Sequence, residues 1–388
     1  IPRPTAGGIG PVCRYAAEGV AQLGRWRCTV VSLHEPAGDY TDDKSGVRFV
    51  GLGLEQDPPR GILEWLRANP QDIVITNDVS RIEPAFPYFP QETLHVVQVH
   101  DSMRRYRDVA VRNHKWIEGV CCVAHHIEEP LRKSLAAVGF RGVLGTVHNG
   151  AAFPPAPARE PPTGPIRLLF MGRMDPFKGI YDLVPILQRL RRLGVPVRLT
   201  IAGGHDQLLE TRFKAKRLDR LVTWAGRVPH EQCYRLAAEH DVFLMLSRKE
   251  PFGMVTIEAM AMGCVPIAYN APSGSTEIIQ HGQSGLLVPL GNFGVLAAAI
   301  SALFRDAAKW SALSAGALQR ARTEFSQDAL ANRWRTFLAL LQAQALHARS
   351  ERRVGLPETN GAEPSTAALP YQCLSQAVRT RLRNKLAA

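Results

Sequence analysis

The stretch from Ser247 to Gly263, SRKEPFGMVTIEAMAMG, sets two acids, Glu250 and Glu258, around a Pro-Phe-Gly turn. The run before it, DVFLML from Asp241, is short, apolar and branched, which is typical of a buried strand. MVTIEAMAMG is rich in helix formers and stops at Gly263, a residue that commonly ends helices. CVPIAY from Cys264 is strand-like again, so the order is strand, acidic loop, helix, strand. In parallel α/β sheets such a loop lies at the carboxyl ends of the strands, where ligands bind.

Strand-like runs alternate with helical stretches along most of the chain, which predicts parallel sheets flanked by helices. The segment 153–165, FPPAPAREPPTGP, interrupts the alternation with six prolines and no hydrophobic periodicity, so we interpret it as a linker. The fold class predicted is therefore α/β, with two doubly wound domains. The other strand-like runs are RCTVVSLH from Arg27, DIVITN from Asp72, LHVVQVH from Leu94, GVCCVA from Gly119, IRLLFMG from Ile166 and VRLTIAGG from Val197.

A chain of 388 residues fits two such domains and a tail. The predicted boundaries are 1–150 for the first domain, 151–165 for the linker, 166–325 for the second domain, 326–348 for a long C-terminal helix and 349–388 for a basic, partly disordered tail. Within the tail, residues 371–388 carry an apolar side chain every fourth position among basic ones, which fits an amphipathic helix on an anionic membrane. A helix docked on its own domain and a disordered segment are the alternatives.

The composition narrows the classes of partner. The net charge is +12, and because residues 1–150 hold 17 basic and 17 acidic side chains, the remaining 30 basic and 18 acidic side chains lie in 151–388. A basic domain attracts a phosphorylated ligand, an anionic lipid surface or nucleic acid, but no zinc-finger spacing or aromatic-basic stripe indicates nucleic acid. Seven cysteines without a C-x-x-C pair indicate free thiols, and no secretion signal or membrane span is evident. The chain is predicted to be cytoplasmic.

Three further features stand beside the acidic loop. AGGIG, Ala6 to Gly10, precedes Pro11 and a helical run, and proline is favoured at the first helical position. MGRMDPFKG follows the strand IRLLF and places Arg173 and Lys178 where they can clamp a diphosphate. His100 ends the run LHVVQVH, in a position to act on a ligand between the domains. Taken singly, these features also fit a plain glycine turn, solvated cations and a core histidine, just as the two acids also fit a solvated surface.

Together these residues carry a family resemblance. SRKEPFGMVTIEAMAMGCVPIA resembles the E-x7-E signature of retaining glycosyltransferases of family 4, which have the GT-B fold of two Rossmann-like domains facing across a cleft. GRMDPFKG is similar to the donor-phosphate segment of that family, AGGIG to its N-terminal glycine loop, and VHNGA from Val147 to the element before its linker. APSGSTEIIQHGQSGLLVP from Ala271 continues the similarity, which covers about residues 6–345 in order.

The resemblance implies a role for each matching residue. The first domain would lie on the acceptor side, and the second would bind the nucleotide-sugar. Arg173 and Lys178 would hold the diphosphate, and Glu258 would accept hydrogen bonds from the ribose diol. Glu250 would orient the transferred sugar. The remaining implied contacts are Gly8 and Ile9 with the phosphates, Gly226, Arg227 and Val228 with the base, the backbone of Phe252, Gly253 and Met254 with the donor sugar, and His100 with the transferred sugar near the reacting carbon.

The predicted activity is that of a retaining glycosyltransferase, a hexosyltransferase, which moves a sugar from a nucleotide diphosphate donor to a hydroxyl acceptor. The donor is expected to be a UDP-sugar, with GDP-mannose as the alternative. The acceptor is expected to be a saccharide or a lipid-linked saccharide, as in surface polysaccharide synthesis, at the inner face of a membrane. A sugar-nucleotide epimerase and a nucleotide-sugar-binding protein without turnover are the other functions considered.

Two more expectations concern what the chain lacks. No D-x-D triplet occurs in the sequence, so we expect no metal and no cofactor, with basic side chains and helix N-termini compensating the diphosphate charge. The family usually has an apolar strand before its glycine loop, whereas this sequence begins IPRPTAGGIG. We therefore expect either an N-terminal sheet without one inner strand or further residues upstream of the printed sequence.

Overall fold

The structure is a computed structural model that describes residues 9–54, 57–78 and 80–348. The predicted membrane-binding segment 371–388 and the predicted phosphate contact Gly8 lie outside these residues. In the N-terminal half the elements are α1 (Ile9–Gln22), β1 (Thr29–Ser32), β2 (Gly38–Thr41), β3 (Arg48–Gly51), α2 (Pro58–Ala68), β4 (Ile73–Asn77), β5 (Leu94–Val99), α3 (Arg104–Arg112), β6 (Gly119–Cys122), α4 (His125–Ala137) and β7 (Val143–Thr146).

The C-terminal half alternates strands and helices in the same way. Its elements are β8 (Ile166–Met171), α5 (Leu183–Arg192), β9 (Val197–Ala202), α6 (Gln207–Ala215), β10 (Val222–Gly226), α7 (His230–Glu239), β11 (Val242–Met245), α8 (Met254–Met260), β12 (Val265–Asn270), α9 (Gly274–Ile278), β13 (Leu286–Pro289), α10 (Phe293–Arg305), α11 (Ala307–Glu324) and α12 (Gln327–Ala348). Short 3-10 turns connect several of them.

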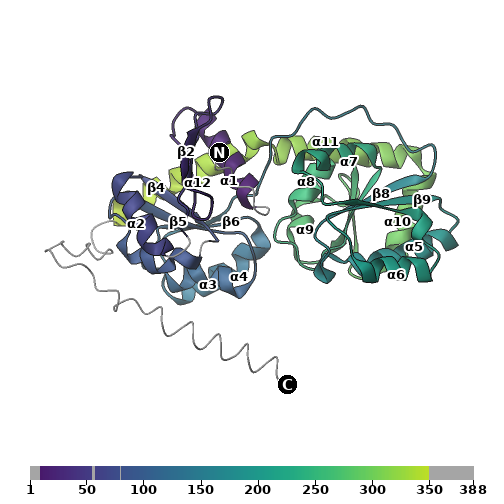
Figure 1. Cartoon of the computed structure of the whole chain (residues 1–388), viewed down its shortest axis with the longest axis horizontal. Coiled ribbons are helices and arrows are strands. Elements are labelled where there is room, and N and C mark those ends of the chain that lie inside the picture. The colour runs from purple at the N-terminus through teal and green to yellow at the C-terminus, as the bar shows by residue number, and fades with distance from the viewer. Residues whose placement is uncertain (1–8, 55–56, 79, 349–388) are drawn as a thin grey trace, which may run out of the picture.

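The C-terminal sheet has six parallel strands in the order β10-β9-β8-β11-β12-β13. Its central strands are buried on both faces because helices cover both (Figure 1), and their sequences are accordingly apolar, apart from the exposed Arg167 of β8 and Asn270 at the end of β12. The first strand lies at the centre and the order runs outward in both directions from it. This is the doubly wound arrangement of a Rossmann-like domain, in which ligands bind where the strand order reverses.

The strands of the N-terminal half form two separate sheets. Strands β4-β5-β6-β7 are parallel and in sequence order, whereas β1-β3-β2 form a mixed sheet in which β2 and β3 pair antiparallel. Among the described residues, no strand is hydrogen-bonded to both sheets. The fold class is confirmed as α/β with two Rossmann-like parts, and the antiparallel pair β2-β3 is an addition that the sequence did not indicate.

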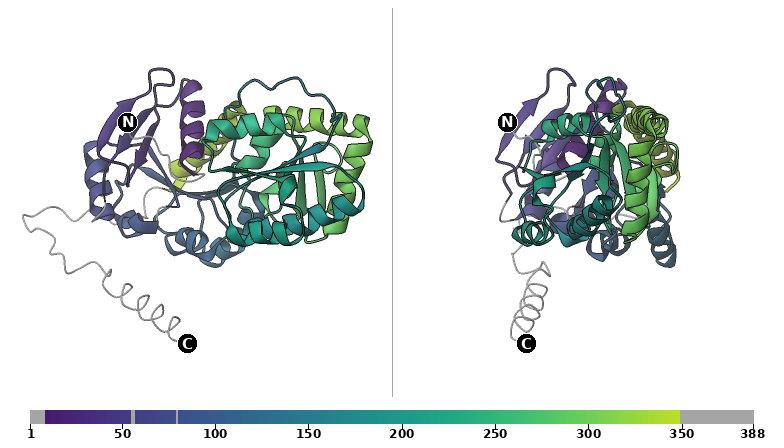
Figure 2. Two further views of the ribbon diagram at one scale, coloured as in Figure 1. Left: turned by 45° about the vertical axis from the view of Figure 1, so that its right-hand side comes forward. Right: turned by 90° about the vertical axis from the view of Figure 1, so that its right-hand side faces the viewer.

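The chain passes between the two halves twice. Residues 152–165 contain no helix or strand and run over the top of the C-terminal half in Figure 1, before β8 begins. After α11 the chain returns, and α12 packs against α1 and β7 of the N-terminal half (Figures 1 and 2). Trp334, Phe337 and Leu341 of α12 are buried there in a shared apolar cluster with Val20 and Val96.

The predicted strands and helices agree with the structure apart from small shifts at their ends. All eight strand-like runs contain a strand. Helix α8 ends at Met260, and a turn leads on to Gly263, which has a φ of +69°. Helix α1 begins at Ile9, so Pro11 lies in its first turn and not at its first position. No helix within the described ranges is both long enough and apolar enough to cross a membrane.

Candidate active site

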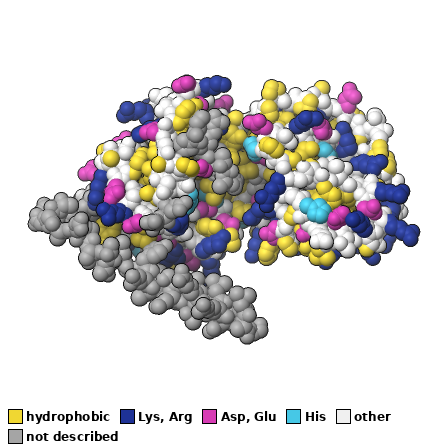
Figure 3. Space-filling view, viewed as in Figure 1, with side chains coloured by type: hydrophobic (Ala, Val, Ile, Leu, Met, Phe, Trp, Pro, Cys, Tyr) yellow, Lys and Arg dark blue, Asp and Glu magenta, His cyan; other side chains and the backbone are white. Residues whose placement is uncertain are grey.

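The site lies where the strand order of the C-terminal sheet reverses. Strands β8 and β11 are neighbours there, and the loops that follow them carry Arg173 and Lys178 on one side and Glu250 on the other. A space-filling view shows the two halves as separate lobes with an indentation between them, and Lys and Arg side chains gather on the edge of the C-terminal lobe that faces it (Figure 3). The fold therefore brings these residues, which are far apart in the sequence, to one edge of the C-terminal sheet.

Glu250 is held in place by two side chains. Its Oε2 lies 2.7 Å from Lys178 Nζ and accepts a hydrogen bond of 2.9 Å from Ser247 Oγ. The side chains of Lys178 and Glu250 are only 21% and 11% exposed, so the ion pair is sheltered from solvent. The interpretation of Glu250 as a solvated surface acid is therefore wrong.

The close approach of the two loops depends on Gly179. This residue has a φ of +76°, and a Cβ atom built on it would lie 2.2 Å from the carbonyl oxygen of Leu246. Only glycine fits a positive φ at such a contact without displacing the backbone. The glycine thus brings the Lys178 loop against the end of β11, which explains how a cation and a carboxylate 72 residues apart meet.

Glu258 lies on α8 and is almost fully buried, with 3% of the residue exposed. Its Oε1 is 2.8 Å from Nε2 of His230, the first residue of α7. The hydrogen bond from His230 to this carboxylate, more than the charge of the carboxylate, raises the pKa of His230, and partial burial opposes the rise. A buried carboxylate with one free oxygen is well suited to accept hydrogen bonds from a diol.

Helix α1 of the N-terminal half reaches the same place. Burial raises the pKa of Tyr15 on α1, and the nearby Glu258 carboxylate raises it further. Glu258 of the C-terminal half therefore affects the titration of a side chain in the N-terminal half. Ile9, the first residue of α1, is partly buried at the start of this helix.

Two of the predicted donor contacts are exposed cations. Arg173 and Arg227 both face solvent, and neither guanidinium group forms an ion pair or hydrogen bond with the residues that the structure describes. Gly226 ends β10 with a φ of +68°, and Val228 is partly buried beside it. The structure therefore leaves these two guanidinium groups available to an anionic ligand.

The Pro-Phe-Gly turn places backbone N–H groups at the start of α8. Gly253 precedes the helix with a φ of +105°, Phe252 is buried, and Met254 is the first helical residue. The first N–H groups of a helix have no partner within it and carry its positive end. The first N–H groups of α8 thus have no partner within the helix, and Gly253 lies against Glu250, whose Cγ would be 3.4 Å from a Cβ atom added at 253.

His100 follows β5 and is buried in the N-terminal half. Its Nε2 lies 2.9 Å from Asn77 Oδ1, and its backbone N–H donates to Asp78 Oδ1 at 3.3 Å. Burial lowers the pKa of His100 to about 4, so the ring is neutral near pH 7. Burial also raises the pKa of Asp78, a residue with a positive φ of 49°, to about 7.

Sequence reasoning missed several residues of this site: Ser247, His230, Tyr15 and Asp78. Ser247 was inside the quoted acidic stretch, so its position three residues before Glu250 was a usable signal. The other three contact the site from separate elements, and nothing in their local sequence marks them. Their contacts arise only from the packing of α1, α7 and β4 around the cleft.

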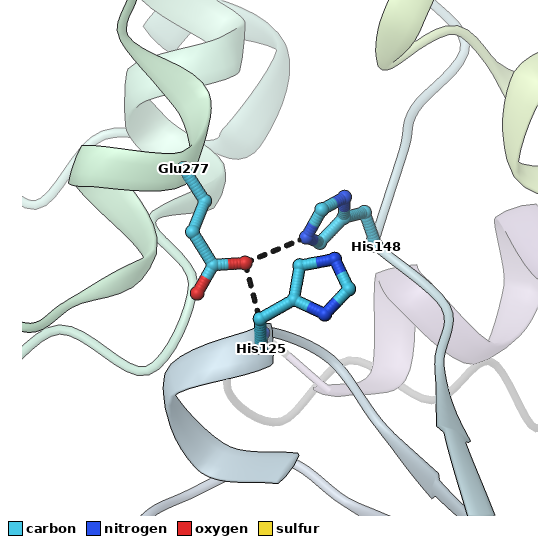
Figure 4. A group of neighbouring side chains, drawn as sticks. All are labelled: His125, His148 and Glu277. Carbon is cyan, nitrogen blue, oxygen red and sulfur yellow. Dashed lines mark hydrogen bonds and ion pairs between the residues drawn. The ribbon is translucent and has the colours of Figure 1, made fainter. Parts of the chain in front are cut away.

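A second polar cluster joins the two halves (Figure 4). His125, His148 and Glu277 have potential ligand atoms within 4.8 Å of one another, so they could hold a metal ion. However, both oxygens of Glu277 already accept N–H groups, two of them at the positive start of α4. A cation at this position would have to displace hydrogen bonds and would face that helix end.

One known protein family matches a large part of the C-terminal half. Residues 156–320 match the family described as "Glycosyl transferases group 1". This range contains Arg173, Lys178, Glu250 and Glu258. The family match and the geometry of the switch point thus concern the same part of the chain.

Two curated relatives each match a little under half of the chain. A glycogen synthase of Mycobacterium tuberculosis is 33% identical over 192 residues, 48% of this chain and 46% of that protein. The amylovoran biosynthesis glycosyltransferase AmsK of Erwinia amylovora is 30% identical over 171 residues, 42% of each protein. The chain therefore matches less than half the length of each of these two relatives.

Solved structures extend the likeness in fold to nearly the whole chain. Sucrose-phosphate synthase from Thermosynechococcus elongatus superposes with a TM-score of 0.72 at 21% identity, covering 88% of this chain and 97% of that one. Anabaena Alr3699/HepE, solved with UDP and glucose, gives a TM-score of 0.64 at 17% identity, covering 86% and 97%. These likenesses establish a two-domain GT-B fold. Within residues 156–320, the chain is similar to the glycosyltransferase group 1 family.

Proposed function

We propose that the protein transfers a sugar from a nucleotide diphosphate sugar to a hydroxyl group of an acceptor, with retention of the anomeric configuration. The observation that carries the proposal is the pair formed by Lys178 and Glu250 at the switch point, with the buried Glu258 on the helix that follows. A cation and a carboxylate side by side offer partners for both parts of such a donor, its diphosphate and its sugar hydroxyls. The names of the curated relatives support a sugar transferase.

The nucleotide part of the donor would occupy the C-terminal half. Arg173, which is exposed and unpaired among the described residues, and Lys178 would bind the diphosphate. Glu258 would accept the ribose hydroxyls, in part replacing its bond to His230. The backbone from Gly226 through Arg227 to Val228 would contact the base. Ile9 would approach the phosphates from the start of α1, where helix N–H groups favour anions.

The transferred sugar would lie between the turn 252–254 and the N-terminal half. Glu250 and the N–H groups of Phe252, Gly253 and Met254 would fix its hydroxyls. His100 would contact the sugar from the opposite side as a neutral ring, since burial lowers its pKa to about 4. A neutral imidazole both donates and accepts one hydrogen bond, so it recognises a hydroxyl without adding charge near the reacting carbon.

We propose front-face attack as the chemical step. The acceptor oxygen forms its bond to the anomeric carbon on the face from which the diphosphate oxygen departs, and the hydroxyl proton passes to the departing diphosphate. Both acids have other assignments in this scheme, because Glu250 binds sugar hydroxyls and Glu258 binds ribose. Arg173, Lys178 and the positive end of α8 would stabilise the charge that develops on the leaving group. With these cations in place, the scheme uses no metal ion and no cofactor.

A UDP-sugar is the donor that we propose, with GDP-mannose as the second candidate. The support is that the HepE structure of the same fold contains UDP and glucose. The acceptor would be a saccharide or a lipid-linked saccharide. The cytoplasm as the place of the reaction is proposed from the seven cysteines, which lack a C-x-x-C pair. Its placement at an anionic membrane surface rests on the basic sequence of 371–388, which lies outside the described residues.

An assay with donor alone and then with donor and acceptor extract tests the proposal. UDP-glucose, UDP-N-acetylglucosamine, GDP-mannose and ADP-glucose are first ranked by thermal shift, because a ligand at about 100 times its dissociation constant stabilises the folded protein by roughly 2.7 kcal/mol. The expected result is sugar transfer only in the presence of acceptor, with the donor's anomeric configuration in the product NMR spectrum. Epimerised donor, donor bound but unchanged, or an inverted product would each contradict the proposal.

A further inference from the structure

Glu277 of the C-terminal half holds four N–H groups of the N-terminal half. Its Oε2 accepts the backbone N–H of His125 at 2.8 Å and lies 2.7 Å from His148 Nε2. Its Oε1 accepts the backbone N–H of His126 at 2.9 Å and lies 3.0 Å from that residue's Nδ1. Figure 4 shows the carboxylate reaching from α9 to the start of α4 and to the segment before the interdomain crossing. We call Glu277, His125, His126 and His148 the interdomain clasp.

The clasp provides the N-terminal cap that α4 lacks in its own sequence. The residue before this helix is Ala124, whose side chain accepts no hydrogen bond, so the first N–H groups have no cap from their own segment. Glu277 caps them from the other half, and its negative charge faces the positive end of the helix. Burial would raise the pKa of Glu277, but hydrogen bonds from His126, His148 and the two backbone N–H groups outweigh burial and hold the pKa well below its usual range. The carboxylate is therefore ionised at neutral pH.

The same helix α9 touches the turn that faces the transferred sugar. The N–H of Gly274, the first residue of α9, donates to the carbonyl of Glu250 at 2.9 Å. A Cβ atom on Gly274 would lie 2.1 Å from the carbonyl oxygen of Phe252, so the two backbones are in direct contact. In addition, the ring of His148 packs 5.9 Å from the ring of Phe252. The clasp is thus in contact with the Pro-Phe-Gly turn through both α9 and His148.

We propose that Glu277 is a positioning residue, which fixes the N-terminal half, and with it His100, relative to the donor turn 250–254. The proposal rests on the function proposed above, because His100 and the turn are assigned there to opposite sides of one sugar. Free nucleotide binds mainly to the C-terminal half in that scheme. Loss of the clasp is therefore expected to impair transfer while leaving nucleotide binding intact.

The test compares Glu277→Gln with Glu239→Gln. The Gln amide at 277 presents an NH₂ group to N–H donors that are bound by a carboxylate oxygen in the wild type. Glu239 is a suitable control because it forms an exposed ion pair with Arg235 on α7, and this pair involves no residue of the clasp. We expect Glu277→Gln to lower kcat about tenfold or more while the dissociation constant for UDP changes by less than about twofold. The control variant is expected to match the wild type in both.

Two further measurements separate positioning from simple destabilisation. Measuring kcat for His148→Gln and for the double variant completes a double-mutant cycle. The double variant is expected to lose about as much kcat as the worse single variant, because both substitutions break the same hydrogen-bonded clasp. Small-angle scattering of the UDP-bound protein is expected to show a wider separation of the two halves in Glu277→Gln. Where Glu277→Gln does not fold, His148→Gln carries the same comparison alone.

The outcomes bear on the clasp and on the proposed function separately. A wild type that transfers no sugar counts against the proposed function. In that case the scattering comparison alone tests whether Glu277 fixes the two halves relative to each other. Unchanged scattering, an unchanged kcat in an active enzyme, or UDP affinity that falls as much as kcat would each overturn the positioning role. Zn²⁺ that stabilises the wild type but not His148→Gln would also overturn it, in favour of a metal site.

Discussion

Lys178 Nζ and Glu250 Oε2 lie 2.7 Å apart and join the loops after β8 and β11, the two central strands of the C-terminal sheet. Because Glu250 is assigned to the sugar and not to the nucleotide, Glu250→Gln is expected to leave UDP affinity nearly unchanged. Turnover is expected to fall by roughly a hundredfold, since a sugar held about 1 Å out of line loses rate on this order. Calorimetry with UDP and a transfer assay measure the two quantities.

Glu258→Gln is expected to show the reverse pattern. The amide keeps the shape of the side chain but loses a charge-assisted hydrogen bond to the ribose, worth roughly 1.5–3 kcal/mol, or about ten- to a hundredfold in affinity. UDP alone is expected to lose nearly as much affinity as the complete donor, because both contain the ribose. If the variants at 250 and 258 weaken UDP binding equally, or if neither has an effect, the assignment of separate roles is wrong.

The His230–Glu258 pair makes stability depend on pH. Its hydrogen bond to Glu258 raises the pKa of His230 in the folded protein, with the neighbouring Glu231 adding a smaller contribution. A histidine with a raised pKa stabilises the fold below its unfolded pKa, and the stabilisation is lost as pH rises through the folded-state pKa. We therefore expect the free energy of unfolding of the wild type to exceed that of His230→Ala most at about pH 5.5, with the difference shrinking toward about pH 8.5.

Denaturant titrations of both proteins across that range provide the measurement. His205→Ala is a suitable control, since His205 is an exposed histidine that pairs with Glu210 at 3.1 Å on the surface. A difference between wild type and His230→Ala that stays constant or grows with pH contradicts the assigned pairing.

Gly179→Ala tests how the two loops are held together. The new methyl group would meet the carbonyl of Leu246 at 2.2 Å in a backbone with positive φ, so the Lys178 loop must move away from β11. We expect a loss of about 1–3 kcal/mol in the free energy of unfolding together with weaker UDP binding. Gly194→Ala is the matched control, because Gly194 also has a positive φ, of 66°, but no atom lies within 4 Å of its added methyl group. Equal effects of the two substitutions on UDP affinity would show that the Leu246 contact is unimportant.

The fold was predictable where apolar runs are continuous. β5, β6 and β11 are buried at every residue, and β8 at every residue except Arg167, so each run is recognisable in the sequence. β2 was not recognisable because its sequence, GDYT, is mostly exposed. The periodicity of α12 predicted a helix but not its partner, since apolar spacing does not reveal which surface a helix covers.

The site was predictable only as a set of motifs. The acids at 250 and 258 and the cations at 173 and 178 stand in recognisable local segments, and the fold brings both pairs to the switch point. Contacts such as His230 with Glu258, or Glu277 with the start of α4, join segments that have no common local pattern. Such pairings depend on how helices pack across sheets and between the two halves, which spacing along the chain does not encode.

The return of α12 to the N-terminal half has a consequence for biosynthesis. Trp334, Phe337 and Leu341 fill the same apolar cluster as Val20 and Val96, so the first half of the chain obtains part of its core from residues translated after the whole second half. On the ribosome, the C-terminal Rossmann-like unit can therefore complete its sheet before the N-terminal one can bury its last apolar surface. Premature termination anywhere before α12 would release a chain whose first-made half still exposes that surface, so the demand for chaperones would depend on when α12 emerges.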